Sequence, residues 1–328
     1  MIARGLRNLP IGSTPRNGWP WVFDLATSQS DASKDLEWPR ITVVTPSFNQ
    51  AKFLEETIRS VLLQDYPNLE YIVIDGGSTD GSIAIIQKYA PWITHWESHS
   101  DHGQSEAINR GLRAATGDIQ CWINSDDYLA PGALADVAKT FLTDPKTDWV
   151  IGAATLLHSE NQTAIRSARR LSKLELMNWT ECNWFCQQAT FWRRSLLLKA
   201  GFLNESLHFV MDWELWLRFY AISLPRILDQ PLAYYRFHKD AKCVATPNKL
   251  LEEDIRLTLS IIDAPETSIL AGYRDAARDR LKGLLSRAYR TQEERRPSLN
   301  YFGSFELLSE VARRSVQRFI PTRSRRIL

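Results

Sequence analysis

Four short apolar runs rich in β-forming residues alternate with helical patterns in the first half of the chain. The runs are ITVVT (41–45), YIVID (71–75), ITHWE (93–97) and IQCWI (119–123). Near-continuous apolarity over this length suits strands that are buried on both faces of a parallel sheet. Helical patterns follow each run, at residues 51–64, 80–90, 104–115 and 131–142. The alternation predicts right-handed βαβ units, and therefore an α/β fold around a mostly parallel sheet.

Polar residues follow every predicted strand. They are Pro46-Ser47-Phe48-Asn49, Asp75-Gly76-Gly77-Ser78, Asp101 and Asn124-Ser125-Asp126-Asp127. Ligands of such sheets bind beyond the carboxyl ends of the strands, so these groups predict a binding site at one edge. Neither GxGxxG nor GxxxxGK[ST] occurs in a strand-turn-helix context, which argues against a dinucleotide dehydrogenase and a P-loop NTPase.

The segment DIQCWINSDDY (118–128) carries two adjacent carboxylates, Asp126 and Asp127, directly after a buried strand. Unpaired negative charge is costly at such a place. A Mg²⁺ or Mn²⁺ ion bound to diphosphate oxygens would compensate it, because these cations take one or two carboxylates plus phosphate. A simple turn whose Asp caps the next helix explains the same peptide, since Asp and Asn favour turns.

Composition limits the class of protein. The chain has 328 residues, 44% hydrophobic and 24% charged, with a formal net charge of +2. This charge is too small to indicate nucleic-acid binding, and the apolar content is ordinary for a globular enzyme. No apolar run reaches 18 residues and no signal-peptide segment is visible, so a cytoplasmic location is expected. Free, mostly buried thiols are expected for the four cysteines, Cys121, Cys182, Cys186 and Cys243.

The segment HFVMDWELWLRFY (208–220) predicts a helix with an apolar face that includes Trp213. Asp212 and Glu214 stand in its first turn. On local grounds they cap the helix and stabilise its dipole.

Two stretches together resemble glycosyltransferase family 2. They are ITVVTPSFNQAKFLEETIRSVLLQDYPNLEYIVIDGGSTDGS and SDHGQSEAINRGLRAATGDIQCWINSDDYLAPGAL, and the similarity extends over residues 40–240. The resemblance implies a GT-A fold, a Rossmann-like nucleotide-binding sheet flanked by helices. It also implies inverting transfer from a nucleotide-diphosphate sugar, aided by Mn²⁺ or Mg²⁺. An N-terminal arm (1–39) and a helical C-terminal region (246–328) would flank a catalytic domain of a nucleotide-sugar half (40–145) and an acceptor half (146–245).

The resemblance also implies roles for the strand-end residues. Asp75 would hydrogen-bond the base, which is uracil in many members, and Asp126 would bind the metal. Asn124 stands where many members have an Asp, and Gly76 replaces a second acidic residue common in that loop. The other nucleotide-binding positions implied are Pro46, Ser47, Asn49, Asp101, Gly103, Ser125 and Lys242, and the other metal positions are Asp127 and His238.

On the acceptor side, the resemblance reverses the local interpretation of Asp212 and makes it the catalytic base, with Glu214 as the alternative. A partly desolvated carboxylate can remove the proton of an attacking hydroxyl. Gln187, Gln188 and Trp213 would contact the acceptor or its sugar. Core packing is the alternative for the aromatic side chains Phe185 and Trp192.

The C-terminal region predicts helices at 249–263 and 266–290 and ends in a basic tail. The arginines of this tail are Arg313, Arg314, Arg318, Arg323, Arg325 and Arg326. Contact with an anionic membrane and a solvated tail are both open interpretations. Membrane contact at the inner face would suit a lipid-linked acceptor, and a carbohydrate acceptor needs none.

Two other classes of function are alternatives to a glycosyltransferase. A nucleotide-sugar or glycan-binding module without turnover would keep the fold, and donor hydrolysis without acceptor would rule it out. A nucleotidyltransferase would need a Gly- and Lys/Arg-rich triphosphate loop, which does not follow the first strand. Donor sugar and acceptor stay undetermined, because a single hydrogen bond can decide between epimers.

Overall fold

The computed structural model describes residues 9–12, 17–21, 37–159, 162–178 and 186–293. The chain divides into two compact units, the first formed by residues 1–170 and 183–238 and the second by 171–182 and 239–328. The second unit therefore begins before the boundary expected at residue 245. It also takes in the segment with helix α6 (Lys173–Met177), because α6 packs against helix α12 (Arg274–Glu293).

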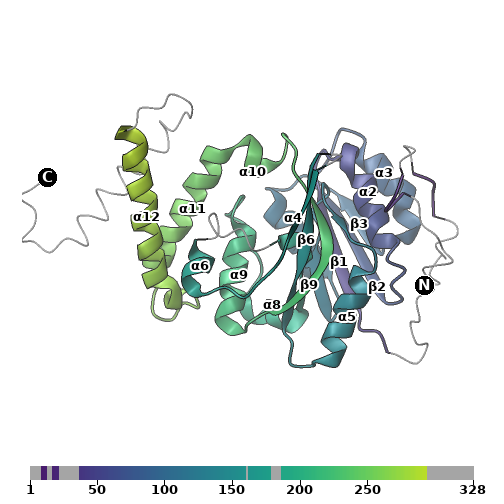
Figure 1. The fold of residues 1–328 in the computed structure, drawn as a ribbon. Coiled ribbons are helices and arrows are strands. Elements are labelled where there is room, and N and C mark those ends of the chain that lie inside the picture. The colour runs from purple at the N-terminus through teal and green to yellow at the C-terminus, as the bar shows by residue number, and fades with distance from the viewer. Residues whose placement is uncertain (1–8, 13–16, 22–36, 160–161, 179–185, 294–328) are drawn as a thin grey trace, which may run out of the picture. The chain divides into compact units, whose positions relative to one another are not determined.

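One sheet forms the centre of the first unit, with strand order β3-β2-β1-β4-β8-β6-β9-β5 and β7 paired to β6 (Figure 1). The strands β3, β2, β1 and β4 are parallel, as the sequence predicts, and β8 runs antiparallel between β4 and β6. The bounds are β1 Ile41–Ser47, β2 Leu69–Asp75, β3 His95–Ser98, β4 Ile119–Trp122, β5 Tyr128–Leu129, β6 Trp149–Ser159, β7 Gln162–Arg166, β8 Thr190–Arg193 and β9 Arg226–Arg236.

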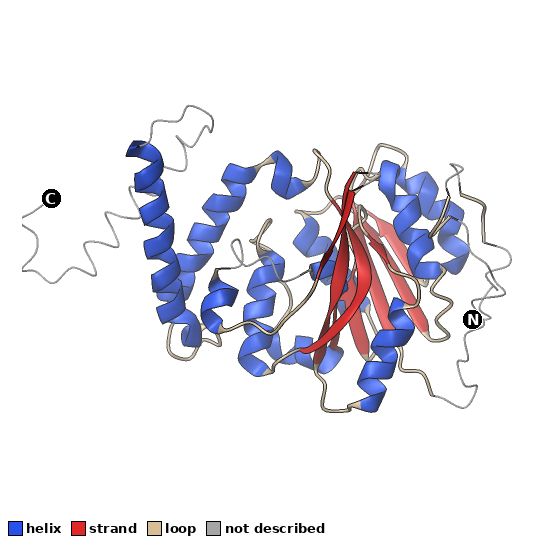
Figure 2. Ribbon diagram, viewed as in Figure 1, coloured by secondary structure: helices blue, strands red, loops and turns tan. Residues whose placement is uncertain are grey.

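Helices cover both faces of this sheet, which is the layering of an α/β fold (Figure 2). Helices α2, α3 and α5 lie on one face, and α4, α8 and α9 lie on the other (Figure 1). Short 3₁₀ turns, η2 (Ala90–Trp92) and η3 (Gln187–Ala189), complete the connections. The bounds are α2 Ala51–Leu62, α3 Ser82–Tyr89, α4 Gln104–Ala114, α5 Ala133–Thr143, α8 Arg194–Ala200 and α9 Met211–Ile222.

The register of the parallel strands aligns their carboxyl ends. Every residue of β1 is buried, and the last two, Pro46 and Ser47, pair with Ile74 and Asp75 of β2. Asp75 in turn pairs with Ser98 at the end of β3. The predicted edge of polar strand ends is therefore present in the fold.

An aromatic cluster fixes helix α9 against the sheet. Trp122, the last residue of β4, stacks on Trp216 with ring centroids 5.6 Å apart and planes 6° from parallel. Trp149, Trp192 and Phe219 pack around the Trp216 ring. Each aromatic pair adds about 0.5–1.5 kcal/mol beyond its buried area. The cluster thus sets the distance between the loop after β4 and the first turn of α9.

The described part of the N-terminal arm lies against the first unit. The Arg59 side chain of α2 donates to the carbonyls of Pro20 (3.1 Å) and Pro10 (2.7 Å). Trp19 Nε1 donates to the carbonyl of Leu129 at 2.8 Å. Residues 9–12 and 17–21 are therefore bonded to α2 and β5 within the first unit, although the sequence predicts only an extended arm.

The second unit consists of α6, α10 (Lys242–Ala245), α11 (Pro247–Ile262), a 3₁₀ turn η4 (Ala271–Tyr273) and α12. Helix α12 starts later than predicted, because turns occupy the residues after Pro265, where Ser268 N donates to the Pro265 carbonyl. A fully buried ion pair between Arg280 and Asp254 joins α12 to α11. Across the described residues, no helix is long and apolar enough to cross a membrane.

Candidate active site

Asp75 closes β2 with a carboxylate that is fully buried. Its Oδ2 accepts hydrogen bonds from Gly77 N (3.1 Å), Ser78 N (2.8 Å) and Ser98 Oγ (2.7 Å), and its Oδ1 accepts from Ser78 Oγ (2.5 Å). Four donors compensate the buried charge and shape the loop after β2. Asp75 thus organises the loop in which it was expected to contact a base.

The residues after β1 join this loop. Asn49, at φ 53°, donates its backbone N–H to Ser78 Oγ (2.8 Å), and its Oδ1 accepts from Thr79 N (2.9 Å). Ser47 Oγ is buried and has no hydrogen-bond partner among the described residues. Phe48 is 60% exposed between them, and the sequence analysis assigned it no role. An aromatic residue in a polar strand-end turn is a signal for stacking on a planar ligand, which could have identified it.

The loop after β3 brings Asp101 next to the end of β2. A Cβ built on Gly76 would lie 2.6 Å from Asp101 Oδ2, so the carboxylate fills the space of the missing side chain. Asp101 Oδ1 accepts from Gly103 N at 2.9 Å. Gly103 has φ +129° and a Cβ there would lie 3.0 Å from His208 Nδ1, so the position favours glycine on both grounds. The structure brings the predicted residues Asp101 and Gly103 to the same edge as Asp75.

Asn124 belongs to a chain of side-chain amides. Gln104 Nε2 donates to Asn124 Oδ1 (2.8 Å), and Asn124 Nδ2 donates to Gln187 Oε1 (3.3 Å). Gln187 Nε2 donates to the carbonyl of Trp122 at 2.7 Å. The Trp122 carbonyl can only accept, so it fixes the direction of every bond in this amide chain. Asn124 therefore connects the N-terminus of α4 to η3.

Asp126 meets His238 on the other side of the same loop. Asp126 Oδ2 lies 3.0 Å from His238 Nε2, and the two side chains are 22% and 12% exposed. His238 Nδ1 is buried without a partner among the described residues. The main chain of the loop is held by Thr57 Oγ1, which donates to the carbonyls of Ser125 (3.0 Å) and Asp127 (2.6 Å).

Asp127 points into the interior and is 1% exposed. Its Oδ2 accepts from Gln188 Nε2 (2.7 Å) and its Oδ1 from Arg236 N (2.9 Å). Burial, together with the neighbouring Asp126 charge, raises the pKa of Asp127 well above its ordinary value. Asp127, which was expected to bind metal, therefore has both carboxylate oxygens engaged inside the fold. Its hydrogen bonds join the loop after β4 to η3 and β9.

Arg236, at the end of β9, supports the Asp126 loop and was missed by the sequence analysis. Its guanidinium donates to the Asp126 carbonyl and lies 2.6 Å from Glu56 Oε2. The group also lies over the rings of Phe53 (5.1 Å) and Tyr128 (4.7 Å). A lone arginine on a strand gives no sequence signal for such a role, because all of these partners are distant in sequence.

The residues that could hold a divalent cation are Asp126 and His238. No group of three or more His, Cys, Asp or Glu side chains in the described part of the chain is arranged to hold a metal. One carboxylate and one imidazole nevertheless fit an ion that takes its remaining ligands from diphosphate and water. The pair is therefore suited to a metal that arrives with the donor.

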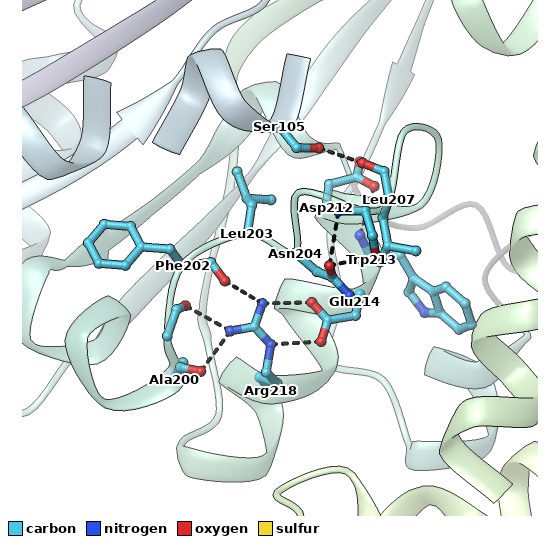
Figure 3. A network of polar contacts seen from close by, with 12 residues as sticks. Ser105, Ala200, Phe202, Leu203, Asn204, Leu207, Asp212, Trp213, Glu214 and Arg218 are labelled. Atoms are coloured by element: carbon cyan, nitrogen blue, oxygen red, sulfur yellow. Dashed lines mark hydrogen bonds and ion pairs between the residues drawn. The ribbon is translucent and has the colours of Figure 1, made fainter. Parts of the chain in front are cut away.

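Glu214 stands in the first turn of α9 and forms a buried ion pair with Arg218 (Figure 3). Arg218 Nε donates to its Oε1 at 2.8 Å, and Arg218 Nη2 to its Oε2 at 2.6 Å. Arg218 also donates to the carbonyls of Ala200, Gly201 and Phe202. Both carboxylate oxygens of Glu214 are thus occupied in the core, so the alternative assignment of the base to Glu214 does not fit its position.

Asp212 is half-buried at the start of α9, and its Oδ1 accepts from Trp213 N at 2.7 Å. The loop that leads to it is held by helix α4. Ser105 Oγ donates to the Leu207 carbonyl (2.6 Å; Figure 3), and Asn109 Nδ2 donates to the Leu203 carbonyl (2.8 Å). Helix α4 begins just after Gly103. This one helix therefore positions both the loop that carries Asp101 and the loop that leads to Asp212.

The predicted acceptor residues are buried. Trp213 is 4% exposed, and Gln187 and Gln188 are 7% and 6% exposed. The two amides bind the loop after β4, and burial of the Trp213 ring leaves little surface for a sugar. Trp192 is fully buried, as core packing predicts, while Phe185 lies outside the described residues. Lys242 lies in the second unit, on α10.

The comparisons with known proteins agree with this architecture. The structure of Staphylococcus aureus TarS 1–349 in complex with UDP-GlcNAc aligns with a TM-score of 0.56 and 18% identity, over 72% of each chain. The mannosyltransferase PcManGT from Pyrobaculum calidifontis, in complex with GDP-Man and Mn²⁺, aligns with a TM-score of 0.53 and 19% identity, over 86% of this chain and 82% of that one. The fold is therefore the GT-A fold of glycosyltransferases.

The sequence comparisons identify the family. A model described as "Glycosyl transferase family 2" matches residues 42–202. An uncharacterized glycosyltransferase of Mycobacterium tuberculosis is 29% identical over 191 residues, 57% of this chain and 71% of that protein. Residues 42–202 match glycosyltransferase family 2, and with relatives that are named glycosyltransferases this match identifies the protein as an enzyme, a transferase.

Proposed function

We propose that this enzyme transfers a sugar from a nucleotide-diphosphate sugar, a UDP-sugar in the first instance, to a hydroxyl acceptor with inversion at the anomeric carbon. The observation that carries the proposal is the Asp126–His238 pair at the carboxyl ends of the parallel strands of a family 2 glycosyltransferase. The acceptor would be a growing polysaccharide or a lipid-linked glycan.

Asp212 would act as the base. The acceptor hydroxyl gives its proton to Asp212 as its oxygen bonds to the anomeric carbon, and the bond from that carbon to the diphosphate oxygen breaks. The nucleoside diphosphate leaves with the electron pair. A single displacement inverts the centre, so an α-linked donor gives a β-glycoside. Support comes from the position of Asp212 on α9 and from the engagement of Glu214 by Arg218.

Asp126 and His238 would hold Mn²⁺ or Mg²⁺. When bound, the ion neutralises the charge that develops on the departing diphosphate. The 3.0 Å separation of His238 Nε2 and Asp126 Oδ2 and the partial exposure of Asp126 support this assignment. The structure of PcManGT was determined in complex with Mn²⁺, which agrees with this assignment.

The donor nucleotide is proposed as UDP, because the similar structure of TarS was determined in complex with UDP-GlcNAc. PcManGT was determined with GDP-Man, so GDP is the first alternative. A binding module without turnover is the other alternative on this fold. The proposed membrane contact, at the cytoplasmic face, depends on the basic tail, which lies outside the described residues.

Calorimetric titration of UDP, GDP and dTDP into the protein tests the donor site, first with Mn²⁺ and then with EDTA. Binding that requires Mn²⁺ supports the proposal, and donor hydrolysis without acceptor then excludes a binding module. The variant Asp212→Asn should bind the donor and lose transfer. Wild-type turnover of Asp212→Asn would refute the base assignment.

A further inference from the structure

The carboxylate beside the end of β2 comes from the loop after β3. Gly76 has no side chain, and its built Cβ would lie 2.6 Å from Oδ2 and 3.2 Å from Cγ of Asp101. Any side chain at position 76 would therefore have to displace the Asp101 carboxylate. This loop therefore places a second carboxylate beside the end of β2, in the space that the missing side chain of Gly76 leaves open.

The two carboxylates at this edge differ in what they can still accept. All four donors described above are directed at Asp75, which is fully buried. Asp101 is half-buried, and its Oδ1 accepts from Gly103 N. Its Oδ2 has no hydrogen bond among the described residues. Asp101 therefore offers one acceptor oxygen to a ligand.

This inference rests on the proposed function: we infer that Asp101 Oδ2, and not Asp75, accepts the ring N–H of a uracil-type base and so selects the nucleotide. Uracil presents one ring N–H between two carbonyls, which matches one acceptor oxygen. Cytosine presents a ring acceptor at the same place, so it would meet the carboxylate oxygen without a proton between them. Guanine presents two adjacent N–H donors, and the second of them would have to share Oδ1 with Gly103 N.

The charges around Asp101 are mixed. Burial raises the pKa of Asp101, while the Gly103 N–H and Arg110 lower it, and Glu106 and Asp75 raise it, so that the net shift is upward. A donor from the base compensates the desolvated charge without adding another cation. The environment is consistent with a carboxylate whose last partner is the ligand.

The decisive variant is Asp101→Asn. Gly103 N–H requires an acceptor, so the amide oxygen takes the Oδ1 place and the NH₂ group takes the place of Oδ2. The NH₂ group of the variant would then face the ring N–H of uracil, donor against donor. It would instead donate a hydrogen bond to the ring acceptor of cytosine. An unmet buried polar group costs about 1–3 kcal/mol, so UDP affinity should fall roughly 10- to 100-fold while CDP affinity rises.

The measurement is the ratio of the dissociation constants of CDP and UDP by calorimetry with Mn²⁺. Gly76→Ala is the second variant. Its Cβ should displace Asp101 and lower UDP affinity without changing any carboxylate. Asp75→Asn is the matched control, which should lower stability but keep the wild-type ratio, because its amide oxygen stays with the N–H groups of Gly77 and Ser78 while Ser78 Oγ loses its acceptor.

The outcomes separate the two proposals. If the wild type binds no nucleoside diphosphate with Mn²⁺, the proposed function fails. If the wild type binds UDP and Asp101→Asn keeps the ratio, the inference alone is overturned. A ratio that changes in Asp75→Asn instead would return base selection to Asp75, and tighter binding of GDP than of UDP would refute a uracil-type base.

Discussion

Replacement of Glu214 by alanine should destabilise the first unit without removing the catalytic base. The Glu214–Arg218 pair is 8% and 9% exposed and is joined by two hydrogen bonds of 2.8 and 2.6 Å. Removal of one partner of a buried pair costs about 3–5 kcal/mol, because the other charge is left uncompensated. Three carbonyls still bind the Arg218 guanidinium, so the lower end, about 3 kcal/mol, is expected. For a domain of this size that corresponds to a fall in Tm of roughly 6–12 °C.

Guanidinium unfolding followed by tryptophan fluorescence measures this cost, since Trp122, Trp149 and Trp192 pack against Trp216 of α9. The coupling with Arg218→Met in a double-mutant cycle isolates the pair, and a value above about 1 kcal/mol is expected. Asp212→Asn is the matched control in the same helical turn. It keeps an acceptor for Trp213 N, so its stability should change by less than about 1 kcal/mol while transfer is lost. If Glu214→Ala kept its stability and lost transfer, Glu214 would be the base and our assignment would be wrong.

Three further predictions follow from the site. Asp126→Ala should abolish the Mn²⁺ dependence of UDP binding in calorimetry, and unchanged dependence would place the metal elsewhere. The preference for UDP over CDP should weaken as the pH falls, because uracil requires an ionised Asp101. The pKa of Asp101 is raised, so the preference should weaken at a higher pH than it would with an ordinary aspartate. Titration of the diphosphate cancels in the ratio of the CDP and UDP dissociation constants, and a ratio that stays constant with pH would count against Asp101. Gly111→Ala should destabilise the protein in thermal unfolding, because its Cβ would lie 2.4 Å from Val44 Cγ1, and wild-type stability would show that α4 can move away from β1.

The sequence predicted the strand-end edge well, because buried parallel strands are apolar and each is followed by polar residues. It could not predict how those polar residues are used. The four donors on Asp75 come in part from Ser98, on another strand, and the partners of Asp127 are Gln188 and the main chain of Arg236. Such long-range hydrogen bonds leave no local pattern.

Some signals were present in the sequence and were not used. Glu214 and Arg218 are four residues apart on a predicted helix, the spacing of an intrahelical ion pair. The apolar helical face that includes Trp213 favoured its burial, and only the family resemblance assigned this ring to the acceptor.

The amide chain through Asn124 also restricts how this sequence can evolve. An aspartate at position 124 would direct a carboxylate oxygen at Gln187 Oε1, and rotation of Gln187 would break its bond to the Trp122 carbonyl. A change to aspartate at position 124 therefore requires a compensating change at Gln187. The single substitution Asn124→Asp would leave a hydrogen bond of Gln187 unmade. Residues 124 and 187 should therefore covary among relatives, whereas Gln104 can donate to an asparagine or an aspartate at position 124.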